Sequence, residues 1–254
     1  MSEMKVGLQL YTIRDHLKTL EGFAEAMKKV ADIGYRYVEL AGVGPIDLED
    51  QKQVCDDNGL SIVATHTRYT EFRDAMEAVI DKHKLLGAEY AAIPALPSDF
   101  RNADGYERFG REATDFAQQL DEAGLGFAYH NHNFEFEKYG DRLGLEILAE
   151  ESDPDLVGIE LDLFWVQHGG ASPVAWMRRL SGRIQMVHLK DFEIYDGEQL
   201  DAEVGEGNFE WDDIFDAARE AGTRYLIVEQ DFCRRPSLES VEISFKNLQA
   251  MGMC

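Results

Sequence analysis

The sequence is poor in several features that would assign a protein to a familiar class. Only three of its 254 residues are cysteines, Cys55, Cys233 and Cys254. They are odd in number and far apart, which favours reduced thiols over a disulfide framework or a cysteine metal site. No apolar run approaches the ~18 residues of a membrane-spanning helix. The first five residues also lack the apolar stretch of a signal peptide. We therefore expect a soluble, cytoplasmic protein with no membrane partner.

Basic residues are scarce as well. The chain holds 25 Lys and Arg, of which 10 are Lys, against 49 Asp and Glu, and its formal net charge is −24 at pH 7. Binding of nucleic acid requires a basic face, so nucleic acid is excluded as a partner. The acidic residues are spread along the whole chain, which favours a solvated acidic coat over an acidic interaction segment.

An acidic coat with few lysines suggests a halophilic protein. At molar ionic strength charges are screened over about 3 Å, and this screening relieves the self-repulsion of such a surface. We therefore expect the protein to unfold as salt is removed, and circular dichroism during dialysis would measure this. A fold that is indifferent to salt would contradict the hypothesis.

A repeated local pattern predicts the fold. Five times a helical segment ends in glycine and a short apolar run follows, at Gly34, Gly59, Gly87, Gly124 and Gly222. Glycine adopts the left-handed conformation that closes a helix at little steric cost. Short apolar runs are typical of strands that are buried on both faces of a parallel sheet. With three further strands at 6–11, 156–162 and 184–190, eight strands begin near residues 6, 35, 60, 89, 125, 156, 184 and 225.

Eight strand–helix units in about 250 residues predict an α/β fold, a single (β/α)8 TIM barrel that takes up residues 1–254 as one domain. Helices are expected at 23–33, 69–86, 106–123, 172–180, 212–221 and 238–251. A doubly wound sheet fits less well. Its first strand would normally run into a glycine-rich phosphate turn, whereas this one runs into Gln9 and Tyr11.

Polar residues occupy the carboxyl ends of the predicted strands, where the active site of such a barrel forms. In chain order they are Gln9 with Tyr11, Glu39, His66, then His130 with His132 and Glu135, Asp162, His188 and Glu229. The densest stretch is YHNHNFEF at 129–136. An unpaired buried polar group costs about 1–3 kcal/mol, so a ring of such groups predicts a bound ligand.

The last four strand ends predict a metal site. Glu135 or a histidine beside it, together with Asp162, His188 and Glu229, would repel one another unless a cation held them. Carboxylates with one imidazole suit Mn²⁺, Mg²⁺ or Co²⁺, and Zn²⁺ is not excluded. Each residue also has an ordinary structural role open to it: Asp162 could cap the following helix, His188 could be a core histidine, and Glu229 could pair with Lys190.

Seven motifs spread over nearly the whole chain carry a resemblance to a known family. They are GLQLYTIRD from residue 7, GYRYVELAG from 34, YHNHNFEF from 129, ELDLFW from 160, VHLKD from 187, VGEG from 204 and IVEQD from 227. Together they resemble the sugar phosphate isomerase/epimerase family. This family is part of the xylose isomerase-like TIM barrel superfamily, which also contains inosose dehydratases and ketose 3-epimerases.

The resemblance implies one divalent metal, commonly Mn²⁺, held by Glu, Asp, His and Glu from strands five to eight. Asp162, His188 and Glu229 match that pattern. Many relatives carry the first glutamate on strand five itself, where this chain has His130 or Asn131. We take Glu135, just beyond the strand, as the expected first ligand. The alternatives are His132, His130 and Glu137.

The expected reaction is proton abstraction next to a carbonyl through a metal-stabilised enediolate, which gives epimerisation or isomerisation. Glu229 and Glu135 are the expected acid–base groups. The runner-up is dehydration of a keto-sugar or inosose, with His132 or His66 assisting the leaving hydroxyl. The residues expected to bind the substrate are Gln9, Tyr11, Glu39, His130, Trp165 and Lys190, and Lys190 with Asp191 could orient its hydroxyls.

The expected substrate is a small sugar, keto-sugar or cyclitol without phosphate, because the chain has no glycine-rich phosphate loop. Two rival functions remain at this point. One is a metal-independent glycosidase that uses Glu135 and Glu229 as its two carboxylates. The other is a sugar-binding protein without catalysis. The sequence leaves a homo-oligomer open.

Overall fold

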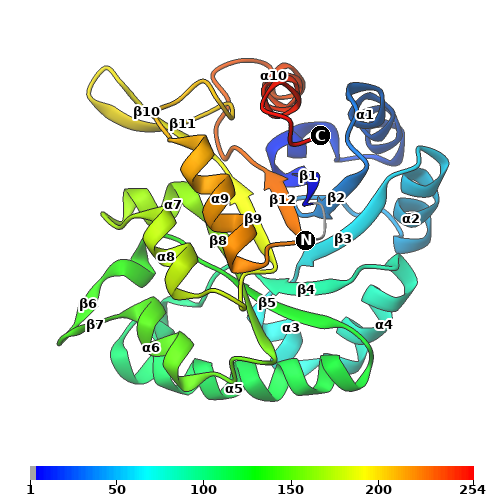
Figure 1. Cartoon of the computed structure of the whole chain (residues 1–254). Helices are drawn as coiled ribbons and strands as arrows, with labels where there is room; N and C mark the ends of the chain where they lie inside the picture. The colour runs from blue at the N-terminus through cyan, green and yellow to red at the C-terminus, as the bar shows by residue number, and fades with distance from the viewer. Residues whose placement is uncertain (1–3) are drawn as a thin grey trace.

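The computed structural model describes residues 4–254, and its eight parallel strands close into a barrel (Figure 1). Around the barrel the strands follow the order β1-β12-β9-β8-β5-β4-β3-β2, and β1 and β2 are also paired. The barrel strands are β1 Lys5–Gln9, β2 Tyr37–Leu40, β3 Ser61–His66, β4 Tyr90–Ile93, β5 Gly126–His130, β8 Val157–Asp162, β9 Met186–Leu189 and β12 Tyr225–Val228. The predicted TIM barrel is therefore confirmed, and each strand begins within two residues of the predicted position.

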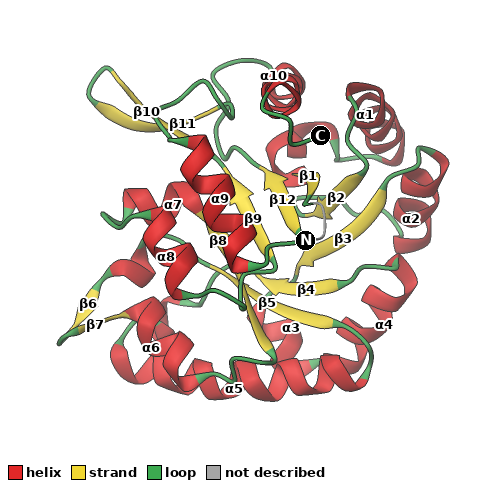
Figure 2. Ribbon diagram, in the orientation of Figure 1, coloured by secondary structure: helices red, strands yellow, loops and turns green. Residues whose placement is uncertain are grey.

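Helices form an outer ring around the strands (Figure 2). They are α1 Leu20–Ile33, α2 Leu48–Asp57, α3 Tyr69–Asp74, α4 Met76–Leu86, α5 Ala103–Glu122, α6 Gly144–Glu151, α7 Leu163–His168, α8 Pro173–Arg179, α9 Trp211–Ala221 and α10 Ser237–Ala250, with short 3-10 helices at Leu10–His16, Ser98–Phe100 and Phe134–Phe136. The single helix predicted at 69–86 is divided at Ala75, whose φ of −149° is not helical. Within residues 4–254 no helix is both long and apolar enough to span a bilayer.

Local sequence explains where several of these helices begin. Ser172 caps α8 by accepting a hydrogen bond from the N–H of Ala175 at 3.4 Å, and Pro173 takes the first helical position, as the sequence predicts. Asn102 caps α5 in the same way by accepting a hydrogen bond from the N–H of Gly105 at 2.9 Å. Such caps fix the point at which each strand–helix loop ends, and these loops carry the mouth of the barrel.

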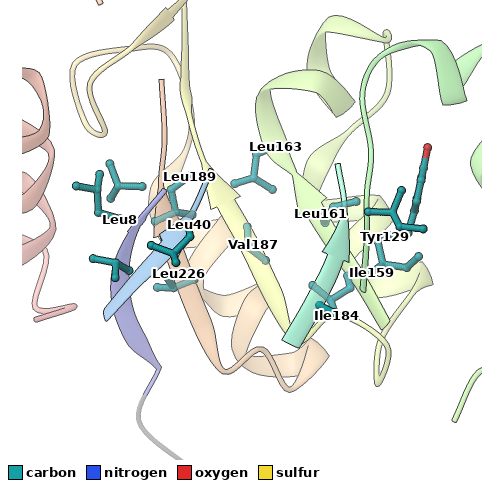
Figure 3. Packing of buried hydrophobic residues seen from close by; sticks show 14 of the residues in the cluster. Leu8, Leu40, Tyr129, Ile159, Leu161, Leu163, Ile184, Val187, Leu189 and Leu226 are labelled. Atoms are coloured by element: carbon teal, nitrogen blue, oxygen red, sulfur yellow. The ribbon is translucent and has the colours of Figure 1, made fainter. Parts of the chain in front are cut away.

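Side chains on the barrel strands alternate between two cores, as the twofold period of a strand requires. One is the larger core, which also contains buried side chains of the surrounding helices. Among its strand residues are Leu8, Leu161, Leu189 and Leu226 (Figure 3). The second core lies within the barrel and contains large side chains at the starts of strands and small ones further along: Tyr90, Met186, Tyr225, Ala64, Ala92 and Ala128. The next positions of the same phase, at the carboxyl ends of β3, β5 and β9, are His66, His130 and His188.

One glycine is needed for this packing. A Cβ atom on Gly126 would lie 2.5 Å from the ring of Tyr90, so a larger residue there would displace a tyrosine that fills the amino end of the barrel.

Two antiparallel hairpins extend from the barrel and were not predicted. β6 Lys138–Tyr139 pairs with β7 Arg142–Leu143, and β10 Asp191–Tyr195 pairs with β11 Glu198–Ala202. Figure 1 shows both of them on the outside of the molecule. The turn of the second hairpin is Asp196-Gly197, and both residues have positive φ, the usual geometry of an Asp-Gly hairpin turn.

Candidate metal centre and active site

Strand register brings the polar side chains to one end of the barrel. β5 pairs with β8 so that His130 lies beside Glu160, and β8 pairs with β9 so that Asp162 lies beside His188. Glu160 and Asp162 are two residues apart on one strand, so both point to the same side. All four residues are buried, as is Glu229 directly after β12.

Four side chains form what we call the Asp162 cluster: His130, Asp162, His188 and Glu229. Each offers one potential ligand atom, and these atoms all lie within 4.8 Å of one another. His188 Nδ1 is 2.8 Å from Glu229 Oε2 and 3.8 Å from Asp162 Oδ2. His130 Nε2 is 3.9 Å from the same Asp162 oxygen. Three of the four expected metal ligands are thus brought together.

Asp162 both caps a helix and faces this cluster. Its Oδ1 accepts a hydrogen bond from the N–H of Trp165 at 2.9 Å, which caps α7. Its Oδ2 is buried and lies 2.9 Å from Lys190 Nζ. The capping role therefore holds for one oxygen only, and the other oxygen faces Lys190 and the histidines of the Asp162 cluster.

Glu135, the expected first ligand, lies outside the Asp162 cluster. Its buried carboxylate accepts hydrogen bonds from the hydroxyl of Tyr129 and from the N–H of His132, the latter at 2.9 Å. His130 stands in the cluster instead, because it is the last residue of β5 and has the phase of the inward-facing Ala128. Strand alternation does not extend to Glu135, which lies beyond the strand in a 3-10 helix.

Three further side chains form a second group, the Glu160 cluster: Glu39, His66 and Glu160. His66 Nε2 lies 2.9 Å from Glu160 Oε2 and 3.2 Å from Glu39 Oε1. His188 joins the two clusters, since its Nε2 is 2.9 Å from Glu39 Oε2. Glu160 was not predicted from the sequence, although its position two residues before Asp162 on the same strand was a usable signal.

Lys190 supplies a fully buried positive charge. Its Nζ lies 2.9 Å from Asp162 Oδ2, 3.0 Å from Glu229 Oε2 and 2.8 Å from Asp231 Oδ2. Burial would lower the pKa of Lys190, but Asp162, Glu229 and Asp231 outweigh it and raise that pKa well above its usual value. The pairing of Glu229 with Lys190, left open by the sequence, exists alongside the Asp162 cluster.

The acids and imidazoles respond differently to burial. Burial raises the pKa of Asp162 to about 6 in spite of Lys190. Burial also opposes the charged form of Glu229, but Lys190 and His188 together hold its pKa below the usual range. Burial and the neighbouring imidazoles lower the pKa of His130 far below its usual value. A neutral imidazole is the form that binds a metal.

An aromatic wall adjoins the clusters. The ring of His132 lies 5.3 Å from that of Trp165 and is stacked at 5.3 Å on Phe134. The guanidinium of Arg101 lies 3.6 Å from the centre of the Phe134 ring. Trp165 also faces Lys190, whose Nζ is 5.5 Å from its ring centre. Phe134 and Arg101 were not singled out from the sequence.

The predicted site residues at the end of β1 and just after it take different positions. Gln9 is fully buried, and its Oε1 accepts a hydrogen bond from the N–H of Tyr11 at 3.2 Å, while its Nε2 has no partner within residues 4–254. Tyr11 is 37% exposed, and its ring stacks against the guanidinium of Arg14 at 4.1 Å. Arg14 also donates to the carbonyl of Asp231 at 2.9 Å, which joins the loop after β1 to the loop after β12.

A family model described as the xylose isomerase-like TIM barrel matches residues 27–250. The chain belongs to this family. Its fold resembles that of a sugar phosphate isomerase/epimerase from Parabacteroides distasonis, with 26% sequence identity and a TM-score of 0.83, over 100% of this chain and 96% of that one.

Two other relatives extend the comparison. The rhizopine catabolism protein MocC of Rhizobium meliloti is 27% identical over 190 residues, which is 66% of this chain and 57% of MocC. The chain thus spans little more than half the length of that relative. The IolI protein, solved with a bound zinc atom, has a TM-score of 0.74 over 98% of both chains at 16% identity. At that identity the likeness shows the fold alone.

The residues of this xylose isomerase-like barrel fit a divalent metal. Asp162 Oδ2 and Glu229 Oε2 lie 2.9 and 3.0 Å from one ammonium group, Lys190 Nζ, which also pairs with Asp231. These buried carboxylates carry more negative charge than that ammonium offsets, and a divalent cation would neutralise the remainder. Two carboxylates and two imidazoles are a donor set that suits Mn²⁺, Co²⁺ or Zn²⁺. His130, Asp162, His188 and Glu229 are the side chains that could hold the ion.

Asp191 does not face the mouth, contrary to the expectation that it orients substrate hydroxyls. It follows Lys190 and therefore points the other way. Its buried carboxylate accepts five hydrogen bonds, from the backbone N–H groups of Phe192, Gly205, Gly207 and Phe209 and from the indole of Trp211. These bonds anchor the VGEG motif. A side chain on Gly207 would collide with the carboxylate.

Replacing Asp191 by asparagine should destabilise the fold by about 3 kcal/mol. The NH2 group of asparagine would face N–H groups that now donate to the carboxylate. Some of these buried N–H groups would be left unpaired, at about 1–3 kcal/mol each. Urea unfolding at pH 7 measures this. Asp81→Asn, at an exposed site on α4, is the matched control and should change the free energy of unfolding by less than about 0.5 kcal/mol. Equal effects of the two changes would contradict the role of Asp191 as an anchor.

Glu135 should make stability depend on pH. Burial raises its pKa from the ordinary 4.5 to about 7, so the folded protein keeps a proton that the unfolded chain releases. The free energy of unfolding should therefore fall as pH rises from about 4.5 to 7, by about 3 kcal/mol from this group. Glu135→Gln should lose that part of the slope in urea unfolding at pH 5 and pH 8 under constant metal. An unchanged slope would show that Glu135 titrates normally.

Proposed function

We propose that this chain is a divalent-metal-dependent sugar isomerase or epimerase that acts by proton abstraction next to a carbonyl. The observation that carries the proposal is the Asp162 cluster, in which two carboxylates and two imidazoles converge, buried, at the carboxyl ends of neighbouring strands. Family membership and the likeness to a sugar phosphate isomerase/epimerase over the whole chain support it. Mn²⁺ is the proposed ion, and the zinc atom of IolI makes Zn²⁺ the first alternative.

The metal would bind the substrate carbonyl and stabilise the negative charge that develops as the proton leaves. Glu229 is the proposed base. Its Oε2 makes the contacts with His188 and Lys190, and its Oε1 takes part in no hydrogen bond or ion pair within residues 4–254. Lys190 holds the carboxylate in place and keeps it ionised, as a base must be before it accepts the proton.

Glu135 is not the proposed partner of Glu229, because its two oxygens accept hydrogen bonds from Tyr129 and from the N–H of His132. Its role is to position His132. Burial lowers the pKa of His132 to about 3, so its ring is neutral. His132 Nδ1 is buried without a partner within residues 4–254, and it is proposed to bind a substrate hydroxyl.

The wall formed by His132, Trp165 and Phe134 suits the C–H face of a sugar or cyclitol ring, which packs well on aromatic side chains. Return of the proton from Glu229 to the neighbouring carbon gives isomerisation. Return to the opposite face of the same carbon gives epimerisation and requires a second proton donor. His66 is the proposed group, because Glu39 and Glu160 raise its pKa in spite of burial. Sugars and cyclitols with a carbonyl beside a hydroxyl are therefore the proposed substrates.

A screen in heavy water tests this function. Purified protein loaded with Mn²⁺ is incubated with a panel of ketoses and inososes, and proton NMR follows the loss of C–H signals next to the carbonyl. A chelated sample is the control. Exchange that depends on the metal supports the proposal, and new vinyl signals would reassign the reaction to dehydration. Binding without any exchange, or turnover of a glycoside that persists in chelator, would overturn it.

A further inference from the structure

We propose that the substrate of this barrel carries an acidic group, a carboxylate or a phosphate, which Arg101 binds at the rim of the mouth. The inference rests on the proposed function, because it names the class of sugar or cyclitol that the same site would take. Arg101 lies in the loop after β4, between the 3-10 helix Ser98–Phe100 and α5. It is exposed, whereas the side chains of the Asp162 cluster are buried. It is therefore placed to bind the end of a substrate that is remote from the reacting carbonyl.

Two contacts hold the guanidinium group of Arg101 in place. Its Nε and Nη2 donate hydrogen bonds to the carbonyl of Leu96 at 3.2 and 3.1 Å. Its central carbon lies 3.6 Å from the centre of the Phe134 ring. The backbone is held as well, because the hydroxyl of Tyr139 donates to the carbonyl of Arg101 at 3.1 Å. A guanidinium group that is already fixed loses less side-chain entropy when it binds a ligand.

The contacts with Leu96 leave one edge of the guanidinium group free. They use the edge formed by Nε and Nη2, and Nη1 takes part in no hydrogen bond or ion pair within residues 4–254. Because the group is planar, Nη1 and the second N–H of Nη2 form a pair of parallel donors that points away from Leu96. Such a pair matches two oxygens of a carboxylate or of a phosphate. The free edge of Arg101 is therefore suited to an acidic group.

The charge of Arg101 has no partner either. The chain holds 49 Asp and Glu against 25 Lys and Arg, so carboxylates are plentiful. Arg108 on α5 stacks on Phe100 at 3.9 Å in a similar way, and it pairs with Glu112 at 3.8 Å. Arg101 forms no ion pair within residues 4–254. In so acidic a chain, an arginine beside the site that keeps its charge unpaired is suited to an anion supplied by the substrate.

Ring contacts connect Arg101 to Lys190 at the centre of the site. Phe134, on which the guanidinium lies, is stacked at 5.3 Å on His132, and His132 lies 5.3 Å from Trp165. The ring centre of Trp165 is 5.5 Å from Lys190 Nζ. The indole N–H of Trp165 and Nδ1 of His132 are buried without hydrogen-bond partners within residues 4–254. A substrate along this wall would meet these two polar groups first and the guanidinium at its far end.

The charge of the whole chain makes a local cation necessary for an acidic substrate. A net charge of −24 repels anions at a distance. Salt at ~1 M screens charges over about 3 Å, which weakens this repulsion but preserves a contact at hydrogen-bond distance. A carboxylate fits better than a phosphate, because one guanidinium edge matches its two oxygens and the chain has no glycine-rich phosphate loop.

Exchange kinetics on a matched series of ketoses test the inference. The sugars 6-deoxyfructose, fructuronate and fructose 6-phosphate differ only in the group at C6, which is remote from the carbonyl. Each is incubated with Mn²⁺-loaded protein in heavy water at ~1 M KCl, where long-range repulsion is screened, and proton NMR gives kcat and KM. We expect kcat/KM for fructuronate to exceed that for 6-deoxyfructose by about 10- to 100-fold, as a charge-assisted bidentate pair provides.

Variants of Arg101 show whether this residue causes the preference. Arg101→Gln should raise KM for fructuronate by about 10- to 100-fold and affect kcat far less, because the contact is remote from the reacting carbon. Arg101→Lys keeps the charge, loses the paired donors and should recover only part of the preference. Arg108→Gln changes the similarly stacked arginine on α5 and should retain the full preference. Circular dichroism verifies the fold of each variant.

Calorimetric titration with the same three sugars adds a readout that needs no turnover. Binding of fructuronate or fructose 6-phosphate that depends on Arg101 supports the inference, and the tighter ligand identifies the acid. Equal kcat/KM for all three sugars, or an acid preference that Arg101→Gln retains, would overturn the inference and leave the proposed function intact. Arg101-dependent binding without exchange would support the inference and overturn the proposed function. Neither binding nor exchange would overturn both.

Discussion

Replacing Glu229 by glutamine should slow the exchange of the substrate C–H proton with solvent by about 10³-fold or more. Glutamine keeps the shape of the side chain but removes the base, and general base catalysis alone accounts for about 10²–10⁴-fold. The change also removes a negative charge that lies 2.8 Å from His188 Nδ1 and 3.0 Å from Lys190 Nζ. Proton NMR in heavy water with metal-loaded protein measures the rate.

Two controls make this result decisive. Glu77→Gln changes an exposed glutamate on α4 and should exchange at the wild-type rate. Circular dichroism and metal analysis of Glu229→Gln show whether a loss arises from unfolding or from loss of the ion. Near-normal exchange in a folded Glu229→Gln protein would refute the assignment of Glu229 as the base.

Replacing Lys190 by methionine should make the stability of the protein depend on metal. Without the ammonium, the buried carboxylates of Asp162 and Glu229 and the partly exposed carboxylate of Asp231 lose the cation that now lies 2.9, 3.0 and 2.8 Å from them. Loss of one partner from a buried ion pair costs about 3–5 kcal/mol. An ion in the Asp162 cluster would compensate for part of this loss, because it binds two of the same carboxylates.

Thermal unfolding with chelator and with Mn²⁺ measures this effect. The metal-free Lys190→Met protein should melt far below the wild type, and added Mn²⁺ should raise its melting temperature by more than it raises that of the wild type. Lys84→Met, at an exposed site on α4, is the matched control and should behave like the wild type. An equal response of Lys190→Met and wild type to Mn²⁺ would show that Lys190 and the metal do not share these carboxylates.

Strand alternation explains why much of the candidate site could be predicted from the sequence. Asp162 and His188 lie at carboxyl ends of barrel strands and have the phase of the side chains that point into the barrel, so the strand pattern alone brings them together. Glycines at the ends of helices marked the strand starts. For this reason the closed barrel followed from residue spacing, without any detail of side-chain packing.

The same alternation would have added one residue to the predicted site and corrected one expectation. Glu160 precedes Asp162 by two residues and had to share its side of the strand, whereas Asp191 follows Lys190 by one and had to face the other way. Glu135 is a different case. It lies past the end of β5, and Tyr129, an outward-facing residue of the strand, binds it with its hydroxyl. No sequence period specifies a contact of this kind.

The break at Ala75 between α3 and α4 and the position of the second hairpin also had no clear periodic signal. The hairpin depends on Asp191, whose five donors come from residues up to 20 positions away. A separate contact joins this hairpin to the loop after β12, because Asp201 in β11 accepts hydrogen bonds from the N–H groups of Asp231 and Phe232.

Anomalous diffraction from crystals of the Mn²⁺-loaded protein tests most directly whether the Asp162 cluster is the metal centre. The account predicts a peak within bonding distance of His130 Nε2, Asp162 Oδ2, His188 Nδ1 and Glu229 Oε2, with Glu135 still bound to Tyr129. A peak coordinated by Glu135, or no peak at the Asp162 cluster in protein that retains manganese by elemental analysis, would contradict it.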